Sequence, residues 1–412
     1  MTRNGESALG IYVSIPFCRS KCTYCNFASG VYPAADHERY VDRLVEDVSQ
    51  APIWSKSMGT ECPRRVDTVY LGGGTPSLLA PDLLVRLFDS IRAEFDLDAD
   101  AEITMECAPG QIADATLVAM AAAGVNRVSL GVQSFVYSEA HASGRLHGRA
   151  IIEEDLRRLR EAGIANLNVD LIAGLPGQTF ASWEESLEAL VESGVPHASV
   201  YMLEVDEYSR LGREMLKGGV RYRADLVPGD DAIARMYERA IERLENAGLA
   251  QYEISNFAPP GFRAKHNLRY WHRRPYLGVG LDASSMLASN TAALGLGGQA
   301  RHPEVLRSTT TDDLKEYLAG PSTPEITHVS PARQFEEAWF LGLRMNEGVE
   351  LIALTQEFGS EKLVPAMQTV ERLVDDGLLI TDGAHARLTS RGRLLSNDVF
   401  QEFLESEVAT IM

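Results

Sequence analysis

The sequence predicts an α/β fold, with a partial (β/α)6 barrel followed by a smaller, winged-helix-like α+β domain. From Ile11 to about Leu203, short β-branched runs alternate with longer helical patterns, which is typical of βα units around a parallel sheet. These units are too few for a closed eight-stranded barrel, which takes about 250 residues of βα repeats. Near residue 331 the pattern changes to helices followed by a hairpin.

Each βα unit is expected where an apolar, β-branched run precedes a helical pattern. The predicted strands are Ile11–Ile15, Val66–Leu71, Glu102–Glu106, Arg127–Gly131, Asn166–Ile172 and Ala198–Val205. The predicted helices are Arg39–Ser49, Pro81–Glu94, Ala115–Ala123, Ile151–Glu161, Ser182–Glu192 and Asp231–Ala247. In parallel βα folds the site lies at the carboxyl ends of the strands, so function is sought just after each strand.

The 412-residue chain carries a formal net charge of -19. This charge disfavours nonspecific binding to DNA or anionic membranes, since both need clustered positive charge, and no nucleic-acid partner is predicted. No apolar run approaches the length of a membrane span, and no signal-peptide core follows the N-terminus. The odd number of cysteines, five, suits a reducing compartment, so the cytoplasm is the predicted location.

Three of these cysteines form a compact metal-binding motif after the first predicted strand. Cys18, Cys22 and Cys25 in CRSKCTYC can aim three thiolates at one point. Iron-sulfur clusters are normally held by four thiolates, so three ligands leave one iron free to bind another molecule. A zinc site is the alternative, but structural zinc takes four protein ligands and no Cys or His follows close after Cys25.

Polar or glycine-rich segments follow the next strands. Gly72-Gly73-Gly74-Thr75-Pro76 comes after the second strand, where absent side chains let the backbone approach a ligand, although a tight turn explains the glycines equally well. Glu106, Gln133 and Asp170 lie at the ends of the third, fourth and fifth strands. Polar groups at successive strand ends predict a pocket that is lined by these side chains.

The cysteine spacing, with Tyr24 before the last cysteine, resembles the radical S-adenosylmethionine (SAM) enzymes. In that family, three cysteines hold a 4Fe-4S cluster whose free iron chelates the amino and carboxylate groups of SAM. The motif YLGGGTPS resembles the coproporphyrinogen oxidase branch of this family, in which the glycine turn contacts the SAM amino group. The motifs IYVSIPFC, CTYCNF, SLGVQSF, LHGRA and NVDLIAGLPGQT occur in the family's order and resemble the haem-chaperone subfamily, HemW.

This resemblance implies a set of cofactor contacts by motif position. The implied SAM contacts are Tyr12, Tyr24, Gly73, Gly74, Thr75, Glu106, Gln133, Arg145 and Asp170. Some of these positions line a second SAM site in the oxidase. Ala108 occupies a place that the family often fills with Asn, which removes one expected polar contact.

A second informative stretch, residues 255–285, is rich in aromatic and basic residues. His266 offers an imidazole beside Tyr270 and Trp271, as an iron porphyrin requires. Nearby cations that could pair with propionates are Arg263, Lys265, Arg269, Arg273 and Arg274. Composition alone favours a packed connecting segment with a satisfied histidine. HNLRYW, however, resembles the His-Asn-x-x-Tyr-Trp motif linked to haem binding in HemW, which implies His266 as the haem ligand. Ser284 stands where many relatives carry His.

The predicted domain boundaries follow from these motifs. Residues 1–300 form the barrel with the 255–285 segment, residues 301–330 a linker, and residues 331–412 the winged-helix-like domain with a hairpin turning at Asp382-Gly383. The last segment holds 14 acidic and 7 basic residues, which argues against DNA binding and for a lid or partner-docking module.

Two main functions remain. The first is a haem chaperone that binds haem, a 4Fe-4S cluster and SAM, and delivers haem to an acceptor protein. The alternative is an oxygen-independent coproporphyrinogen III oxidase. Whether SAM is turned over is left open. The oxidase carries an extra cysteine where this chain has Phe27, and a longer arm where this chain has 17 residues before Cys18, so both features favour the chaperone. A winged-helix regulator with an iron-sulfur sensor is disfavoured by the charge.

Overall fold

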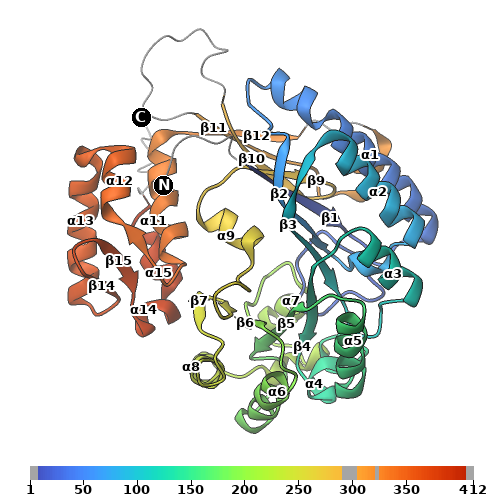
Figure 1. Ribbon diagram of the computed structural model, residues 1–412. Coiled ribbons are helices and arrows are strands. Elements are labelled where there is room, and N and C mark those ends of the chain that lie inside the picture. The colour runs from blue at the N-terminus through green and yellow to red at the C-terminus, as the bar shows by residue number, and fades with distance from the viewer. Residues whose placement is uncertain (1–7, 290–303, 321–323, 405–412) are drawn as a thin grey trace.

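The computed structural model describes residues 8–289, 304–320 and 324–404. Its main element is a curved 12-stranded sheet with the order β12-β11-β10-β9-β1-β2-β3-β4-β5-β6-β8-β7 (Figure 1). Strands β1 to β6 are parallel neighbours in chain order. The six strands are β1 Leu9–Ile15, β2 Arg65–Gly73, β3 Asp96–Cys107, β4 Arg127–Gln133, β5 Asn166–Ala173 and β6 His197–Met202. The predicted partial barrel is confirmed.

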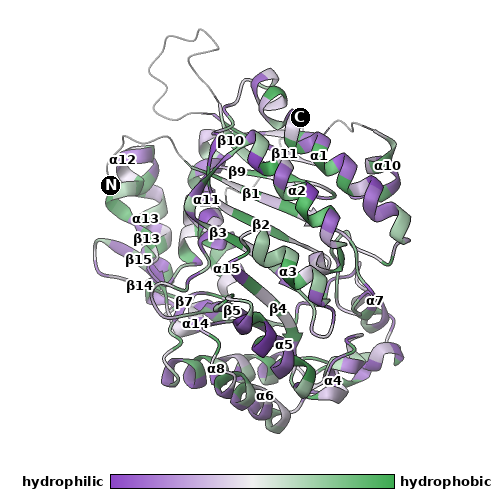
Figure 2. Cartoon of the chain, turned by 45° about the vertical axis from the view of Figure 1, so that its right-hand side comes forward, coloured by the Kyte–Doolittle hydropathy of each residue, from purple (hydrophilic) through white to green (hydrophobic). Residues whose placement is uncertain are grey.

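Long helices cover the outer face of this sheet, and all six predicted helices are present (Figure 1). They are α1 Ala34–Ser57, α2 Pro81–Glu94, α3 Asp114–Ala122, α5 Arg149–Glu161, α6 Phe180–Glu192 and α8 Asp230–Asn246. Shorter helices stand in the connections: η1 Pro76–Leu78, α4 Tyr137–Ala142, α7 Arg210–Leu216 and η2 Arg221–Leu226. In Figure 2, hydrophobic and hydrophilic residues lie side by side along these helices, as expected of an outer layer with one face on a core.

Helix α1 is longer than predicted because it continues through a proline. The prediction ended at Ser49, shortly before Pro52, which cannot donate a backbone hydrogen bond. The helix runs on to Ser57, and Ala51 and Ser55 beyond the predicted end are buried. Packing against the sheet therefore outweighs the local cost of the proline.

The sheet continues on both sides of the six parallel strands. β7 Gln251–Glu253 and β8 Asn256–Phe257 extend the β6 edge, and β9 Tyr276–Val279 pairs parallel to β1. Residues 301–330 were expected to be a linker. Their described part instead carries β11 Val305–Thr309, α10 Leu314–Ala319 and β12 Glu325–Val329, and β10 Ser284–Ala288 joins β11 to β9.

Helix α9, Lys265–Trp271, lies on the inner side of the curved sheet, opposite the covering helices (Figure 1). Its start is fixed by β3, because the Glu102 carboxylate accepts the backbone N–H groups of Lys265 and His266, each at 3.0 Å. The first N–H groups of a helix have no partner within the helix, so the carboxylate supplies their hydrogen-bond acceptor. Its negative charge also interacts favourably with the positive end of the helix dipole.

The C-terminal part packs around a small core that includes Trp339 and Phe400 and that Ile254 joins from the barrel side. Three helices precede a hairpin, as predicted, and two short helices follow it. The elements are α11 Pro331–Leu343, β13 Val349–Glu350, α12 Leu351–Phe358, α13 Ser360–Asp375, β14 Leu379–Thr381, β15 His385–Leu388, α14 Ser390–Leu394 and α15 Ser396–Gln401. Gly383 takes a φ of 82° in the hairpin turn, a conformation that suits glycine.

A search of the helices within the described residues finds none with the length and apolar character needed to cross a membrane.

Candidate cluster and cofactor site

A pocket of about 310 Å³ lies inside the curved sheet, between the loop that follows β1 and the inner faces of β2 to β6. Most of the predicted site residues line it together. These are Cys18, Cys22, Cys25, Tyr24, Gly73, Gly74, Thr75, Glu106, Gln133, Arg145 and Asp170. The structure thus gathers side chains from five separate βα units at one place.

The three motif cysteines are free, half-buried thiols in the loop after β1. The loop is held by backbone bonds from Cys18 N to the Gly30 carbonyl at 2.8 Å and from Thr23 N to the Ser143 carbonyl at 3.1 Å. Burial raises the pKa of the Cys18 thiol, while a hydrogen bond from Thr75 Oγ1, 3.8 Å from its Sγ, opposes this rise.

The three thiols line the same pocket. In the described part of the chain, no three His, Cys, Asp or Glu side chains are grouped so that they could hold a single metal ion. Sulfur donors of this kind select iron-sulfur clusters, and three of them leave one iron open.

The glycine turn after β2 packs directly on the backbone that leads into the cysteine loop. Gly74 N donates to the Ile15 carbonyl and Thr75 N to the Phe17 carbonyl, both at 2.8 Å. A Cβ on Gly74 would stand 2.7 Å from the Ile15 oxygen, which is closer than real Cβ atoms approach. Gly73 takes a φ of 96°, a conformation that other residues rarely adopt. The turn therefore sets the position of the cysteine loop as well as lining the pocket.

Two carboxyl groups face the pocket from β3 and β5, the strands on either side of β4. Glu106 accepts a 2.8 Å hydrogen bond from Tyr70 Oη, and burial raises the pKa of its carboxyl to about 7. Burial also raises the pKa of Asp170, which accepts bonds from Ser129 at 3.0 Å and Asn168 at 2.7 Å. A carboxyl group kept near neutrality at pH 7 can exchange a proton when a cation enters the pocket.

Gln133 is held in a strained conformation at the end of β4. Its φ is 68°, and its buried Oε1 accepts no hydrogen bond from the described residues. A non-glycine residue in the left-handed region is uncommon, and such strain clusters at functional sites. Both features favour a ligand at this position.

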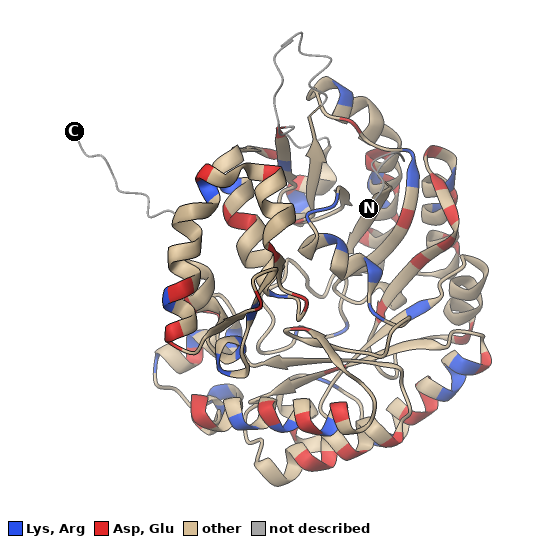
Figure 3. Cartoon of the chain, turned by 60° about the vertical axis from the view of Figure 1, so that its left-hand side comes forward, with Lys and Arg blue, Asp and Glu red and all other residues tan. Residues whose placement is uncertain are grey.

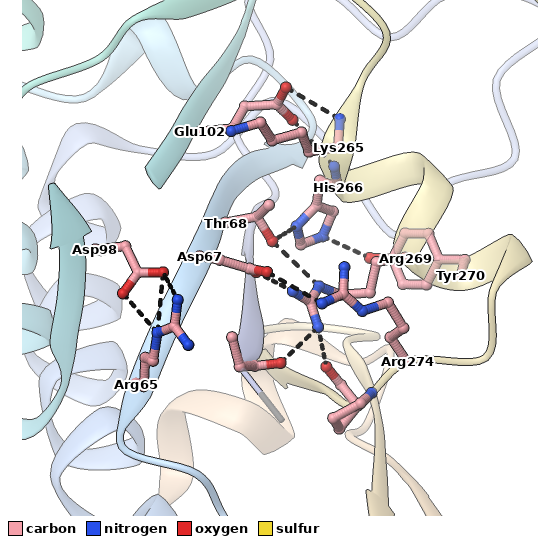
Figure 4. Close-up of polar contacts among 12 residues, drawn as sticks. Arg65, Asp67, Thr68, Asp98, Glu102, Lys265, His266, Arg269, Tyr270 and Arg274 are labelled. Atoms are coloured by element: carbon pink, nitrogen blue, oxygen red, sulfur yellow. Dashed lines mark hydrogen bonds and ion pairs between the residues drawn. The ribbon is translucent and has the colours of Figure 1, made fainter. Parts of the chain in front are cut away.

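Tyr12 and His266 do not line the pocket. Both flank Tyr70, with ring centroids 6.0 and 5.2 Å from it. His266 is only 1% exposed, with Nδ1 2.9 Å from Thr68 Oγ1 and Nε2 2.9 Å from Tyr270 Oη (Figure 4). Burial lowers its pKa to about 3, so the ring is neutral and both nitrogens are engaged.

The basic residues expected to pair with propionates all have partners within the protein. Arg269 is fully buried and bonds Asp67 and the carbonyls of Ala8 and Pro275, and Arg274 also reaches Asp67 (Figure 4). The three others bind the C-terminal part or β3: Arg263 to Glu347, Arg273 to Glu357 and Lys265 to the Asp100 carbonyl. The segment is packed in the way that its composition alone favours.

The inner face of the strands contributes pocket residues that sequence reasoning missed. They are Tyr70, Arg127, Ser129, Asn168, Ser199 and Tyr201, and α9 adds Asn267. The sequence signal was a period of two in the strands, with polar residues at 127, 129 and 133 and at 168 and 170. Strands covered on both faces read as continuous apolar runs, so this alternation indicates a polar interior.

The comparisons with known proteins agree on one family. Residues 12–190 match the model of the radical SAM superfamily, and residues 329–395 match the HemN C-terminal domain. The heme chaperone HemW of Lactococcus lactis is 32% identical over 402 residues, which cover 96% of this chain and 97% of that protein. The chain belongs to the HemW family.

Other relatives extend this result. The heme chaperone HemW of Escherichia coli is 31% identical over 96% of this chain and 98% of its own length. The mouse radical S-adenosyl methionine domain-containing protein 1, mitochondrial, is 31% identical and covers 94% of this chain and 86% of that protein. The structure of coproporphyrinogen III oxidase (HemN) from Escherichia coli has a TM-score of 0.79 at 23% identity, covering 97% of this chain and 90% of that one. That likeness shows that the HemW family member has the HemN fold.

Proposed function

We propose that this member of the HemW family is a haem chaperone that binds a 4Fe-4S cluster, SAM and haem and delivers haem to acceptor proteins. The observation that carries the proposal is the pocket in which three free thiols meet the glycine turn and the polar residues Glu106, Gln133 and Asp170 of three strands. The HemW names of full-length relatives support the chaperone role.

The proposed cluster ligands are Cys18, Cys22 and Cys25, because these three thiols line the same pocket. A bound 4Fe-4S cluster supplies an open iron for SAM and a redox centre. Thr75 and Ser29 hold the loop by hydroxyl contacts to Cys18 and Cys25 sulfurs at 3.8 and 3.9 Å.

The proposed SAM contacts form the walls next to the cluster end. They are Tyr24, Gly73, Gly74, Thr75, Glu106, Gln133, Arg145 and Asp170, with Tyr12 behind them. Arg145 donates to Tyr24 Oη at 3.3 Å, so the cationic side chain and the tyrosine are positioned together. Glu106 and Asp170 provide acceptors for the hydroxyl and amino groups of the ligand, and Gln133 an unpaired amide oxygen.

For haem, His266 is the proposed axial ligand, and its surroundings define what binding requires. An imidazole coordinates iron through the lone pair of one ring nitrogen. Since both nitrogens are already hydrogen-bonded, haem binding requires that His266 leave Thr68 or Tyr270. Contacts with the C-terminal part hold the same segment, because Arg344 lies 4.4 Å over the Trp271 ring and Arg273 pairs with Glu357. The C-terminal part thus acts as the proposed lid over the haem segment.

Further proposals complete the account. Since β11 and β12 continue the barrel sheet as far as Val329, the proposed boundary between the barrel and the second domain lies near residue 330. The cytoplasm is the proposed location, because all five cysteines are free thiols. A nucleic-acid partner is not proposed: acidic and basic residues are mixed along the outer helices in Figure 3, whereas phosphate contacts need clustered cations.

The cluster assignment is tested by replacing Cys18, Cys22 and Cys25 together with Ala. Reconstituted protein should lose its iron and its broad visible absorption, while Cys62→Ala, which alters a thiol distant in sequence from the motif, should keep both. Retention of iron by the triple variant would place the cluster elsewhere.

The haem assignment is tested with His266→Leu, which keeps bulk but offers no lone pair. The wild-type protein should bind haem with a Soret band distinct from that of free haem, and the variant should lose this band while keeping its cluster. His272→Ala is the control. Unchanged haem affinity and spectrum in His266→Leu would rule out this ligand.

A further inference from the structure

The floor of the pocket holds an arginine without a partner. Arg127 begins β4, is 2% exposed and lines the pocket. No hydrogen bond or ion pair joins its guanidinium to another residue of the described ranges, and its buried Nε has no acceptor. A guanidinium carries five donors and remains charged in proteins. The charge of Arg127 opposes the rise that burial causes in the pKa of the Asp170 carboxyl, but its buried Nε has no hydrogen-bond acceptor.

The carboxylates around Arg127 are committed to other groups. Asp170 accepts from Ser129 through one oxygen and from Asn168 through the other. Glu106 accepts from Tyr70, and Glu102 binds the backbone N–H groups at the start of α9 through both of its oxygens. Within the described residues, none of these three acids forms a hydrogen bond or ion pair with the Arg127 guanidinium.

The other fully buried arginine of the described chain shows the usual arrangement. Arg269, 1% exposed, forms an ion pair with Asp67 and donates to two backbone carbonyls. Burying an arginine without such partners is costly, and buried charges are normally paired. An unpaired arginine that faces a pocket is therefore explained best by an anionic group that enters the pocket.

The position of Arg127 indicates which anion this can be. Arg127 and Gln133 are the two ends of β4, so the floor lies roughly 20 Å along the strand from its carboxyl end. A SAM molecule that chelates the open iron has its own carboxylate at the cluster end. The planar guanidinium matches a carboxylate in a bidentate pair, and Asn168, Ser199 and Asn267 add polar groups beside it.

We propose that Arg127 is the receptor for the carboxylate of a second small molecule, bound in the same pocket below the SAM position. This proposal rests on the proposed function in one respect, which is that SAM occupies the part of the pocket next to the motif cysteines. Two sources share this chemistry, the propionate of a porphyrin and the methionine carboxylate of a second SAM molecule.

The test uses two variants. Arg127→Met keeps the length of the side chain and loses its charge. Arg127→Lys keeps the charge and loses the planar guanidinium group that can form two parallel hydrogen bonds. Cluster-reconstituted full-length protein is titrated anaerobically with haem, haem dimethyl ester, SAM and decarboxylated SAM, and binding is measured by equilibrium dialysis. For one carboxylate ligand, Arg127→Met should lower affinity about 10- to 100-fold. The analogue of that ligand without the carboxylate should bind the wild-type protein and Arg127→Met with equal affinity.

The ligand that loses affinity identifies the source. A loss for haem alone assigns a propionate, and a loss of a second SAM equivalent with the first retained assigns a methionine carboxylate. Arg127→Lys should recover part of that affinity. The cluster spectrum should not change in either variant, which separates a failure at Arg127 from a failure of the cluster assignment.

Thermal unfolding distinguishes this role from a structural one. Because the charge lacks a partner, Arg127→Met should unfold at the same or a higher temperature than wild type without ligand, and should lose the stabilisation that the carboxylate ligand gives. A lowered unfolding temperature, or wild-type affinity for all four ligands, would overturn the proposal.

Discussion

Among the individual residues, Glu106 is a half-buried carboxyl on the pocket wall. Its carboxyl has a pKa of about 7, whereas in the unfolded chain it titrates at its ordinary value near 4.5. The folded state therefore binds a proton more tightly than the unfolded state. As pH rises from about 4.5 to 7, the unfolded chain loses this proton first, and the free energy of unfolding falls.

The prediction concerns Glu106→Gln, which keeps an acceptor for Tyr70 and removes the titration. Relative to this variant, the wild-type protein should lose up to about 3 kcal/mol of stability as the pH rises from 4.5 to above 7. Urea unfolding of cluster-free protein at a series of pH values measures the difference. A difference that does not change with pH would show that Glu106 titrates normally.

A second prediction at this scale concerns Gly73. Its φ of 96° disfavours any side chain, and a Cβ would meet Ser14 Oγ at 3.0 Å, so Gly73→Val should obstruct the pocket wall and weaken SAM binding at least about tenfold. Gly163→Ala is a matched control, since Gly163 has a φ of 88° with open space around its Cβ position. Equal SAM affinity of Gly73→Val and wild type in equilibrium dialysis would remove the turn from the site.

At the scale of single elements, α9 determines whether His266 can reach a ligand. Tyr270 stands one turn after His266 in the same helix and binds its Nε2. If this nitrogen ligates haem, Tyr270→Phe removes a competing hydrogen bond and should raise haem affinity about 2- to 10-fold. Thr68→Val tests the other nitrogen in the same way. Lower haem affinity in both variants would contradict release of His266 as the step that permits ligation.

The strands show what sequence reasoning could find and what it could not. The runs of β-branched residues located β1 to β6, and the ends of β3 and β4 pointed to Glu106 and Gln133, because strand ends follow from chain order. Asp170 was also predicted for the site, although it lies inside β5. The partners of His266 could not be predicted, since Thr68 lies 198 residues away and meets it only when α9 folds inside the sheet. The sequence analysis also missed the pairing of β11 and β12 with the sheet, because the flanking Pro and Gly residues are typical of a linker.

At the scale of the whole molecule, the chain shares the fold of the oxidase without the extra cysteine. Phe27 stands at that position, 61% exposed at the pocket. Protein with its cluster, SAM and a low-potential reductant should therefore not convert coproporphyrinogen III to protoporphyrinogen IX. Chromatographic detection of vinyl product over several turnovers would make the oxidase the function.

The most direct test of the haem chaperone proposal is an anaerobic titration of the cluster-reconstituted protein with haem, followed by visible absorption. The proposal predicts a Soret band distinct from that of free haem, saturating at a fixed ratio of haem to chain, with the cluster absorption retained and the band lost on addition of an acceptor apoprotein. A spectrum equal to the sum of free haem and protein at every ratio would contradict it.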